Sequence, residues 1–248
     1  MPVTFHITLD IFCARISEAP LIGIISRVLT TDWVSFYIVF CYNSCNLTKI
    51  DFTRLMDPEE YNMTLDALLK EYCPWNAQER QDVSEILRRL EQGEELYTRD
   101  NPSAHLTVSG WVVSPDRTQI LLAYHNLYDS WAWLGGHADG DRNLLAVALR
   151  EVQEESGVTA RPVSESIFSV EILPVSDHEK HGIYIPSHLH LNITFLLEAD
   201  PDTPLRCKAD ENSRVRWFSL ENALAASSEP WIRDRIYRKL NEKVTAFL

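Results

Sequence analysis

The sequence predicts an α/β protein in which helices pack on a sheet as a sandwich, with a short helical region before it. The hydrophobic pattern is helical from residue 64 to residue 93 and has a period of two from His105 onward. One strong helix, residues 142–156, separates the first strands from the later ones, and further helices close the chain. This order differs from the strand–helix alternation of a doubly wound parallel sheet, so a sandwich is expected.

Composition divides the 248-residue chain into three regions. Residues 1–62 mix β-branched, aromatic and cysteine residues without a sustained period, and we expect an N-terminal extension of uncertain order. A small accessory unit packed on the main domain is the alternative for these residues. Residues 63–100 are predicted to be a helical lead-in packed on the main domain, and residues 101–248 to be that domain.

The helical lead-in contains two helices. The first includes "LDALLKEY", which places three leucines on one face. In the second, Asn76 and Glu79 fit a capping box at the start and Gly93 fits the stop. Its apolar stripe consists of Val83, Ile86, Leu87 and Leu90.

The main domain begins with a predicted hairpin. Residues 105–113 and 119–125 are apolar and β-branched, and "SPDRT" between them is a turn. The later strands are expected at residues 166–175, 189–199 and 213–220, and the closing helices at 219–226 and 230–244.

Charge and cysteine usage exclude several classes of protein. The formal net charge is −13, which repels nucleic-acid phosphates, although a cation can still mediate contact with a small phosphorylated substrate. Five scattered cysteines argue against a disulfide framework and favour a cytoplasmic location. The longest apolar stretch is interrupted by Arg27 and Asp32, so no membrane span is expected. The oligomeric state stays open, a homodimer included.

The central helix carries an unusual group of acids. Glu151, Glu154 and Glu155 are neighbours at i, i+3 and i+4, where like charges repel one another. The last two lie in the final turn, where the helix dipole disfavours anions by about 0.3–1 kcal/mol each. A bound Mg²⁺ or Mn²⁺ would relieve both costs, because such cations prefer oxygen ligands. A solvated acidic face is the alternative interpretation.

The segment before this helix, "WAWLGGHADGDR", is predicted to be a flexible loop. Gly135, Gly136 and Gly140 allow the backbone to approach a ligand closely. A glycine-rich loop that leads into a helix with terminal carboxylates suits a metal–diphosphate site.

From residue 136 to residue 158 the chain resembles the Nudix box, G-x5-E-x7-R-E-U-x-E-E-x-G-U, in which U is aliphatic. One position departs: Arg142 stands where the family has its first glutamate, the usual partner of the arginine at position 150. Asp141 or Asp139 would have to substitute for it. The matching positions are Gly136, Arg150, Glu151, Val152, Glu154, Glu155, Gly157 and Val158.

The resemblance implies a Nudix-type α/β/α sandwich with a mixed sheet. It also implies hydrolysis of a nucleoside diphosphate linked to another group, with one to three divalent cations as cofactors. The implied ligands are Glu151, Glu154 and Glu155, with a backbone carbonyl of Gly135 or Gly136. Glu154, or an acid from a distant loop, would activate water, and the neighbouring Arg150 would orient Glu151. A non-catalytic nucleotide sensor and an isoprenoid-diphosphate isomerase are the alternatives.

Three residues outside the acidic helix are further candidates for the site. Glu211 precedes a strand and is either a further metal ligand or base, or a solvated turn residue. His137 follows the glycine pair and is either a substrate contact or a plain loop histidine. Tyr124 belongs to an aromatic run whose members either stack on a planar substrate group or pack in the core.

Four histidines lie close together in the sequence. His188 and His190 alternate and so share one face of a strand, and His178 and His181 precede them. They are candidates for binding a transition metal or for contacting a phosphate.

Overall fold

The structure is a computed structural model of the chain, and it describes residues 7–16, 19–29, 35–41, 64–180 and 182–246. The chain divides into two compact units, Met1–Tyr61 and Asn62–Leu248. In the first unit, β1 (Ile7–Ile16), β2 (Ala19–Leu29) and β3 (Ser35–Cys41) form an antiparallel sheet in the order β1-β2-β3.

The second unit contains the helices and strands that the sequence predicts, with several short strands besides. Its helices are α1 (Leu65–Glu71), α2 (Ala77–Glu91), α3 (Leu144–Ser156), α4 (Leu220–Ala226), α5 (Pro230–Ile232) and α6 (Arg238–Ala246), with a π-helical segment η2 (Arg233–Tyr237). Its strands are β4 (Ala104–Val113), β5 (Gln119–His125), β6 (Ser130–Ala132), β7 (Leu134–His137), β8 (Arg161–Pro162), β9 (Ser169–Val175), β10 (His178–Lys180), β11 (Ile183–Ile185), β12 (His188–Glu198) and β13 (Asn212–Ser219).

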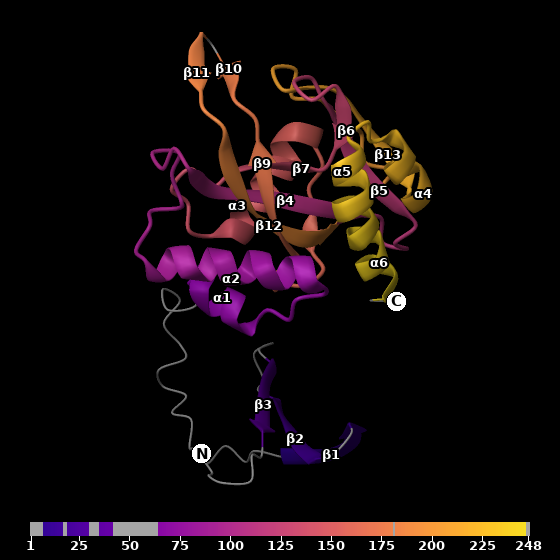
Figure 1. Cartoon of the computed structure of the whole chain (residues 1–248). Helices are drawn as coiled ribbons and strands as arrows, with labels where there is room; N and C mark the ends of the chain where they lie inside the picture. Colours follow the sequence, from indigo (N-terminus) through magenta and orange to yellow (C-terminus); the bar gives the residue numbers. More distant parts are fainter. Residues whose placement is uncertain (1–6, 17–18, 30–34, 42–63, 181, 247–248) are drawn as a thin grey trace, which may run out of the picture. The chain divides into compact units, whose positions relative to one another are not determined.

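The central sheet of this unit is mixed. Its strands follow the order β13-β5-β4-β12-β8, with β6 beside β5, β7 beside β4 and β9 beside β12. The neighbours β4 and β12 are parallel, and the other pairs are antiparallel. The hairpin of β10 and β11 projects from one end of the sheet (Figure 1). The prediction of a mixed sheet is therefore confirmed.

Two apolar clusters lie on opposite faces of the sheet, because side chains alternate along each strand. On β4, Leu106 and Val108 join the cluster formed with α1, α2 and α3. Trp111 and Val113 of the same strand join the cluster formed with α4, η2 and α6. Figure 1 shows the two sets of helices along different sides of the sheet. This arrangement is the α/β/α sandwich expected from the sequence.

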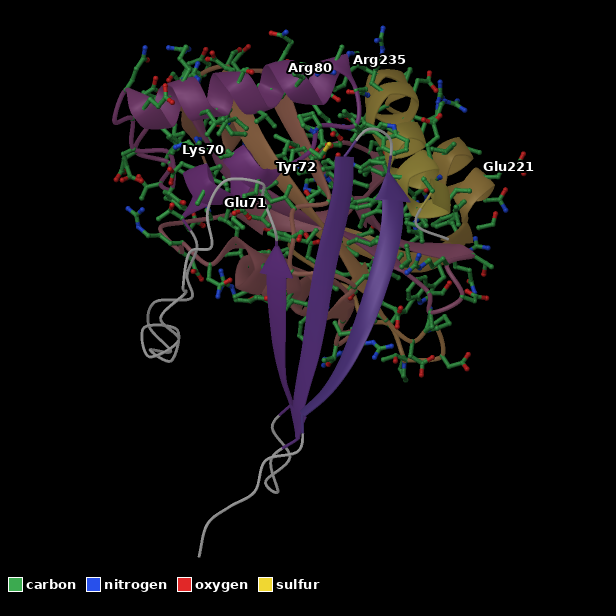
Figure 2. All side chains as sticks on the ribbon, turned by 90° about the horizontal axis from the view of Figure 1, so that it is seen from below. Lys70, Glu71, Tyr72, Arg80, Glu221 and Arg235 are labelled. Carbon is green, nitrogen blue, oxygen red and sulfur yellow. The ribbon has the colours of Figure 1, made fainter. Side chains whose placement is uncertain are left out.

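A buried ionic network joins α2, α6 and β9. Glu79, which is fully buried, lies 3.0 Å from Nζ of both Lys239 and Lys243. Lys239 also lies 2.9 Å from the buried carboxylate of Glu171 on β9. Tyr72, which follows α1, donates a hydrogen bond to Glu79 and is half-buried, whereas Arg80, the residue after Glu79 on α2, is exposed (Figure 2). Removing one charge from such a network leaves the others buried without a partner.

Two details of the predicted elements are wrong. The glycine pair lies in a strand, not in a flexible loop, because Gly135 and Gly136 pair with Ser109 and Val108 of β4. The closing helix is interrupted by the π-helical segment. Both features depend on contacts with distant parts of the chain, which local sequence patterns do not record. No helix among the described residues is long and apolar enough to cross a membrane.

Candidate active site

Helix α3 is held at both ends by features that the sequence contains. The side chain of Asn143 accepts a hydrogen bond from the amide of Ala146 at 3.0 Å and caps the start. Gly157 ends the helix with a φ of 74°, a left-handed conformation that glycine adopts without strain. These ends fix the direction of the last two turns, which carry the three box glutamates.

Glu155 is buried, with 4% of its surface exposed. Its carboxylate accepts a hydrogen bond of 3.1 Å from the amide of Gly135 on β7. Burial raises the pKa of Glu155 to about 8, against the lowering effect of that amide, and the charges of Glu151 and Glu211 add to the rise. The alternative interpretation, a solvated acidic face, therefore does not fit Glu155, because α3 packs this position against β7.

Glu151 lies directly against the backbone of Gly136. A Cβ atom at residue 136 would lie 2.5 Å from Cδ of Glu151, so only glycine leaves room for the carboxylate in this position. Burial raises the pKa of Glu151, Lys208 lowers it, and the neighbouring Glu154 raises it. The strand β7 and the helix α3 thus hold this carboxylate beside the glycine pair.

Lys208 forms ion pairs with Glu154 and Glu211. Its Nζ lies 2.9 Å from Oε2 of Glu211 and 3.6 Å from Oε2 of the exposed Glu154. The ion pair with Glu211 raises the pKa of Lys208 to about 12. The structure therefore brings Glu211, from the loop before β13, to the three glutamates of α3. Lys208 was not predicted as a site residue, although its position three residues before Glu211 was a usable signal.

The structure shows how the site accommodates Arg142 where the Nudix box has a glutamate. Arg150 pairs with Asp141 at 3.1 Å, so an aspartate one position earlier takes the place of the expected glutamate. The guanidinium of Arg142 instead lies over the ring of Tyr97, 4.6 Å from its centre. Asp139, the other candidate partner, binds Arg99, a residue that no local pattern indicated.

The donor set fits a hard divalent cation. Three α3 carboxylates and Glu211 influence one another's charge, and Lys208 is the cation paired with two of them. The absence of a side chain at Gly135 and Gly136 leaves their backbone accessible beside Glu155 and Glu151. Carboxylate and carbonyl oxygens are the ligands that Mg²⁺ and Mn²⁺ prefer.

The structure brings His188 and His190 to His105, and it places His137 beside them. The Nε2 atoms of His188 and His190 are 3.2 Å apart. The ring of His105 lies 4.8 Å from that of His188, and the ring of His137 lies 4.9 Å from that of His190. His181 lies outside the described residues. His105 was not foreseen as a partner, because 83 positions separate it from His188 in the sequence.

Tyr124 lies on β5 opposite Arg214 of β13. The guanidinium of Arg214 is 4.2 Å from the centre of the Tyr124 ring, and Trp131 meets the same ring edge-on at 5.5 Å. Trp131 and Trp133 are partly buried against the second apolar cluster, which agrees with the core-packing interpretation. The contacts that the structure gives for Tyr124 do not include the box glutamates, although the adjacent β13 begins directly after Glu211.

Comparison with known proteins gives one family. Residues 104–240 match the family model described as NUDIX domain. Among solved structures, an Ap4A hydrolase from C. elegans is 19% identical, with a TM-score of 0.41, over 57% of this chain and 96% of that one. A NUDIX-family hydrolase from Clostridium perfringens is 18% identical, also with a TM-score of 0.41, over 58% of this chain and 98% of that one. A search of curated proteins finds no match.

Proposed function

The chain belongs to the Nudix family, whose members hydrolyse pyrophosphate bonds, and from this premise we propose a divalent-cation-dependent pyrophosphohydrolase acting on a nucleoside-diphosphate-linked small molecule. The family makes the protein an enzyme that acts on a small-molecule substrate. The nucleoside diphosphate in the substrate, the dependence on a cation and the roles of the residues are our proposal.

One observation carries the proposal: acids from two separate segments meet beside the glycine pair of β7. Glu155 binds the amide of Gly135, and Glu151 lies against Gly136. Lys208 joins Glu154 to Glu211. A helix that only covered a sheet would have no need to bury an acid and to collect others around it, because each like-charged neighbour lowers stability.

In the proposed site, Glu151, Glu154 and Glu155 hold Mg²⁺ or Mn²⁺, together with a carbonyl oxygen of Gly135 or Gly136. When bound, the cation neutralises charge on the diphosphate and polarises the phosphorus–oxygen bond. The protein contributes the fixed positions of the ligands. Burial of Glu155 and the contact of Glu151 with the backbone keep both carboxylates from turning away.

We assign Glu154 the task of accepting the proton of the attacking water. It is the exposed member of the three, so water reaches it. Glu211 is the alternative base, because Lys208 holds it beside the same group. The substitutions Glu154→Gln and Glu211→Gln separate the two: the base variant loses kcat, whereas a residue that only helps to hold the cation raises the concentration of Mg²⁺ required.

Arg150 is assigned a positioning role. It lies one residue before Glu151 and is itself held by Asp141 at 3.1 Å. This pair supports an active enzyme over the non-catalytic sensor, since the arginine at residue 142 was one of two grounds for the sensor hypothesis, the other being the unusual N-terminal region. The isomerase alternative draws no support from a described feature of the site.

His137 and Tyr124 remain the candidates for contact with the substrate. His137 follows Gly136 on β7, and its ring lies 5.1 Å from that of His105 and 4.9 Å from that of His190, so it would contact a part of the substrate that extends toward these histidines. Tyr124 would offer a ring to a planar substrate group, but Arg214 would have to leave its face. A cytoplasmic location is part of the proposal, and the free thiols of Cys73 and Cys207 support it.

The experiment is a panel of nucleoside diphosphates linked to sugars, nucleosides and other alcohols, assayed with Mg²⁺ and with Mn²⁺. We expect hydrolysis of at least one member and its loss in Glu155→Gln, with circular dichroism showing a retained fold. Glu221→Gln is the matched control, because this glutamate lies on the exposed surface of α4 (Figure 2). Absence of turnover with every member by the folded protein would overturn the proposal.

A further inference from the structure

Three histidine side chains converge where β4 and β12 begin. His105 and His190 are in register on these parallel strands, so their side chains project from the same face of the sheet. His188 lies two residues before His190 and shares that face. One ligand nitrogen from each of the three lies within 4.8 Å of the other two.

Backbone contacts set the protonation of two of these rings. Nδ1 of His188 lies 2.8 Å from the carbonyl oxygen of Pro186, and Nδ1 of His105 lies 3.3 Å from that of Asn101. A carbonyl oxygen only accepts, so each Nδ1 carries the proton and each Nε2 keeps a lone pair. Histidine ligands of metals commonly have this arrangement, in which a backbone carbonyl fixes the ring and leaves the other nitrogen for the metal.

The convergence leaves a polar atom without a hydrogen-bond partner. His105 is 5% exposed, and its Nε2 is buried with no partner among the described atoms. Burying such a nitrogen lowers the stability of the fold when nothing binds it. Nε2 of His188 and Nε2 of His190 lie 3.2 Å apart and are hydrogen-bond partners of each other, whereas Nε2 of His105 takes no part in this contact. One cation would bind all three.

We propose that His105, His188 and His190 form a second metal site, which binds Zn²⁺ or a similar late first-row ion through their ring nitrogens. Imidazole nitrogen suits such ions, whereas carboxylate and carbonyl oxygen suit Mg²⁺. A zinc–nitrogen distance of about 2.1 Å places two tetrahedral ligands roughly 3.4 Å apart, close to the 3.2 Å between His188 and His190. A small rotation of the His105 ring completes the set.

The chemistry of the cluster favours a metal over a phosphate. Nε2 of His105 and Nε2 of His188 each keep a lone pair, because Nδ1 of each ring carries the proton that it donates to a backbone carbonyl oxygen. Neutral imidazole is the form that binds a metal, and the charged form attracts an anion. Three protein ligands leave a fourth position for water or for an oxygen of a bound molecule.

The test is zinc binding by the full chain, measured by equilibrium dialysis in millimolar Mg²⁺ so that carboxylates are occupied. We expect one tightly held Zn²⁺ per chain and an affinity at least about 100-fold lower in His190→Ala and in His188→Gln. His178→Ala is the matched control, because the ring of His178 lies 6.2 Å from that of His188 and outside the three-residue group. Glu151→Gln must also keep the zinc.

A second measurement needs no variant. In ¹⁵N-resolved imidazole spectra of the wild-type chain, Zn²⁺ should shift the Nε2 resonances of three histidines, and inorganic phosphate should leave them unchanged. Zinc bound as tightly by the histidine variants, zinc lost in Glu151→Gln, or a shift with phosphate in place of zinc would each overturn the proposal.

Discussion

The buried carboxylate of Glu79, paired with Lys239 and Lys243, stabilises the fold. Burial alone would raise its pKa, but Lys239, the hydroxyl of Tyr72 and Lys243 outweigh burial and lower the pKa to about 2, against an ordinary 4.5. At 1.36 kcal/mol per pKa unit, this difference corresponds to about 3 kcal/mol of stability at neutral pH. We expect Glu79→Gln to lower the free energy of unfolding by this amount, as breaking a buried ion pair does.

The pH dependence has a definite sign. Because the pKa of Glu79 is lower in the folded state, its contribution is complete above pH 4.5 and is lost as the pH falls from 4.5 toward 2. The free energy of unfolding in urea should therefore differ less between wild type and Glu79→Gln at pH 3.5 than at pH 7, by about 1 kcal/mol.

Glu85→Gln is the matched control on the same helix. Its carboxylate binds Arg88 and Arg89 but is 33% exposed, so solvent screens the pair and the loss should be at most about 1 kcal/mol. The reasoning is refuted if Glu79→Gln lowers the free energy of unfolding at pH 7 no more than Glu85→Gln does. It is also refuted if the difference in this free energy between wild type and Glu79→Gln does not change with pH.

Three further outcomes concern the site. Gly136→Ala should lower kcat by on the order of 100-fold while the melting temperature changes little, because the new Cβ displaces the end of the flexible Glu151 side chain; equal activity would contradict this. Asp141→Ala should lower kcat about tenfold by freeing Arg150, and adding Arg142→Glu should restore it; failure of this rescue would remove the positioning role. Treatment with EDTA should lower the melting temperature and Mg²⁺ should restore it, since a cation that binds only the folded state stabilises that state; a melting temperature indifferent to both would count against the cation site.

Local patterns in the sequence were enough to predict the main elements and the acidic helix. Asn143 caps the start of α3 and Gly157 caps its end, as capping rules require. The alternation of side chains along β4 and β12 places the apolar residues of these strands on both faces of the sheet. The pairing of β7 with β4 was missed, because glycine has no side chain from which strand periodicity can be read.

The site itself was predictable only in part. The Nudix-box pattern names the three glutamates, but it does not reveal that Glu155 is buried against Gly135 or that Lys208 joins Glu154 to Glu211. The contacts of Glu155 with Gly135 and of Lys208 with Glu154 connect residues that are 20 and 54 positions apart in the sequence. The histidine group could not be predicted in full either, because it forms through the register of β4 with β12, which brings His105 beside His190.

The central claim is that the carboxylates beside β7 support cation-dependent cleavage of a phosphoanhydride bond. The most direct measurement is ³¹P spectroscopy of the substrate panel in ¹⁸O-labelled water, with and without Mg²⁺, for wild type and Glu154→Gln. The account predicts labelled phosphate in one product only when Mg²⁺ and the wild-type protein are both present, and a rate lowered by at least about 100-fold in the variant. Labelled product that forms at the same rate without a divalent cation, or in Glu154→Gln and Glu155→Gln alike, would contradict it.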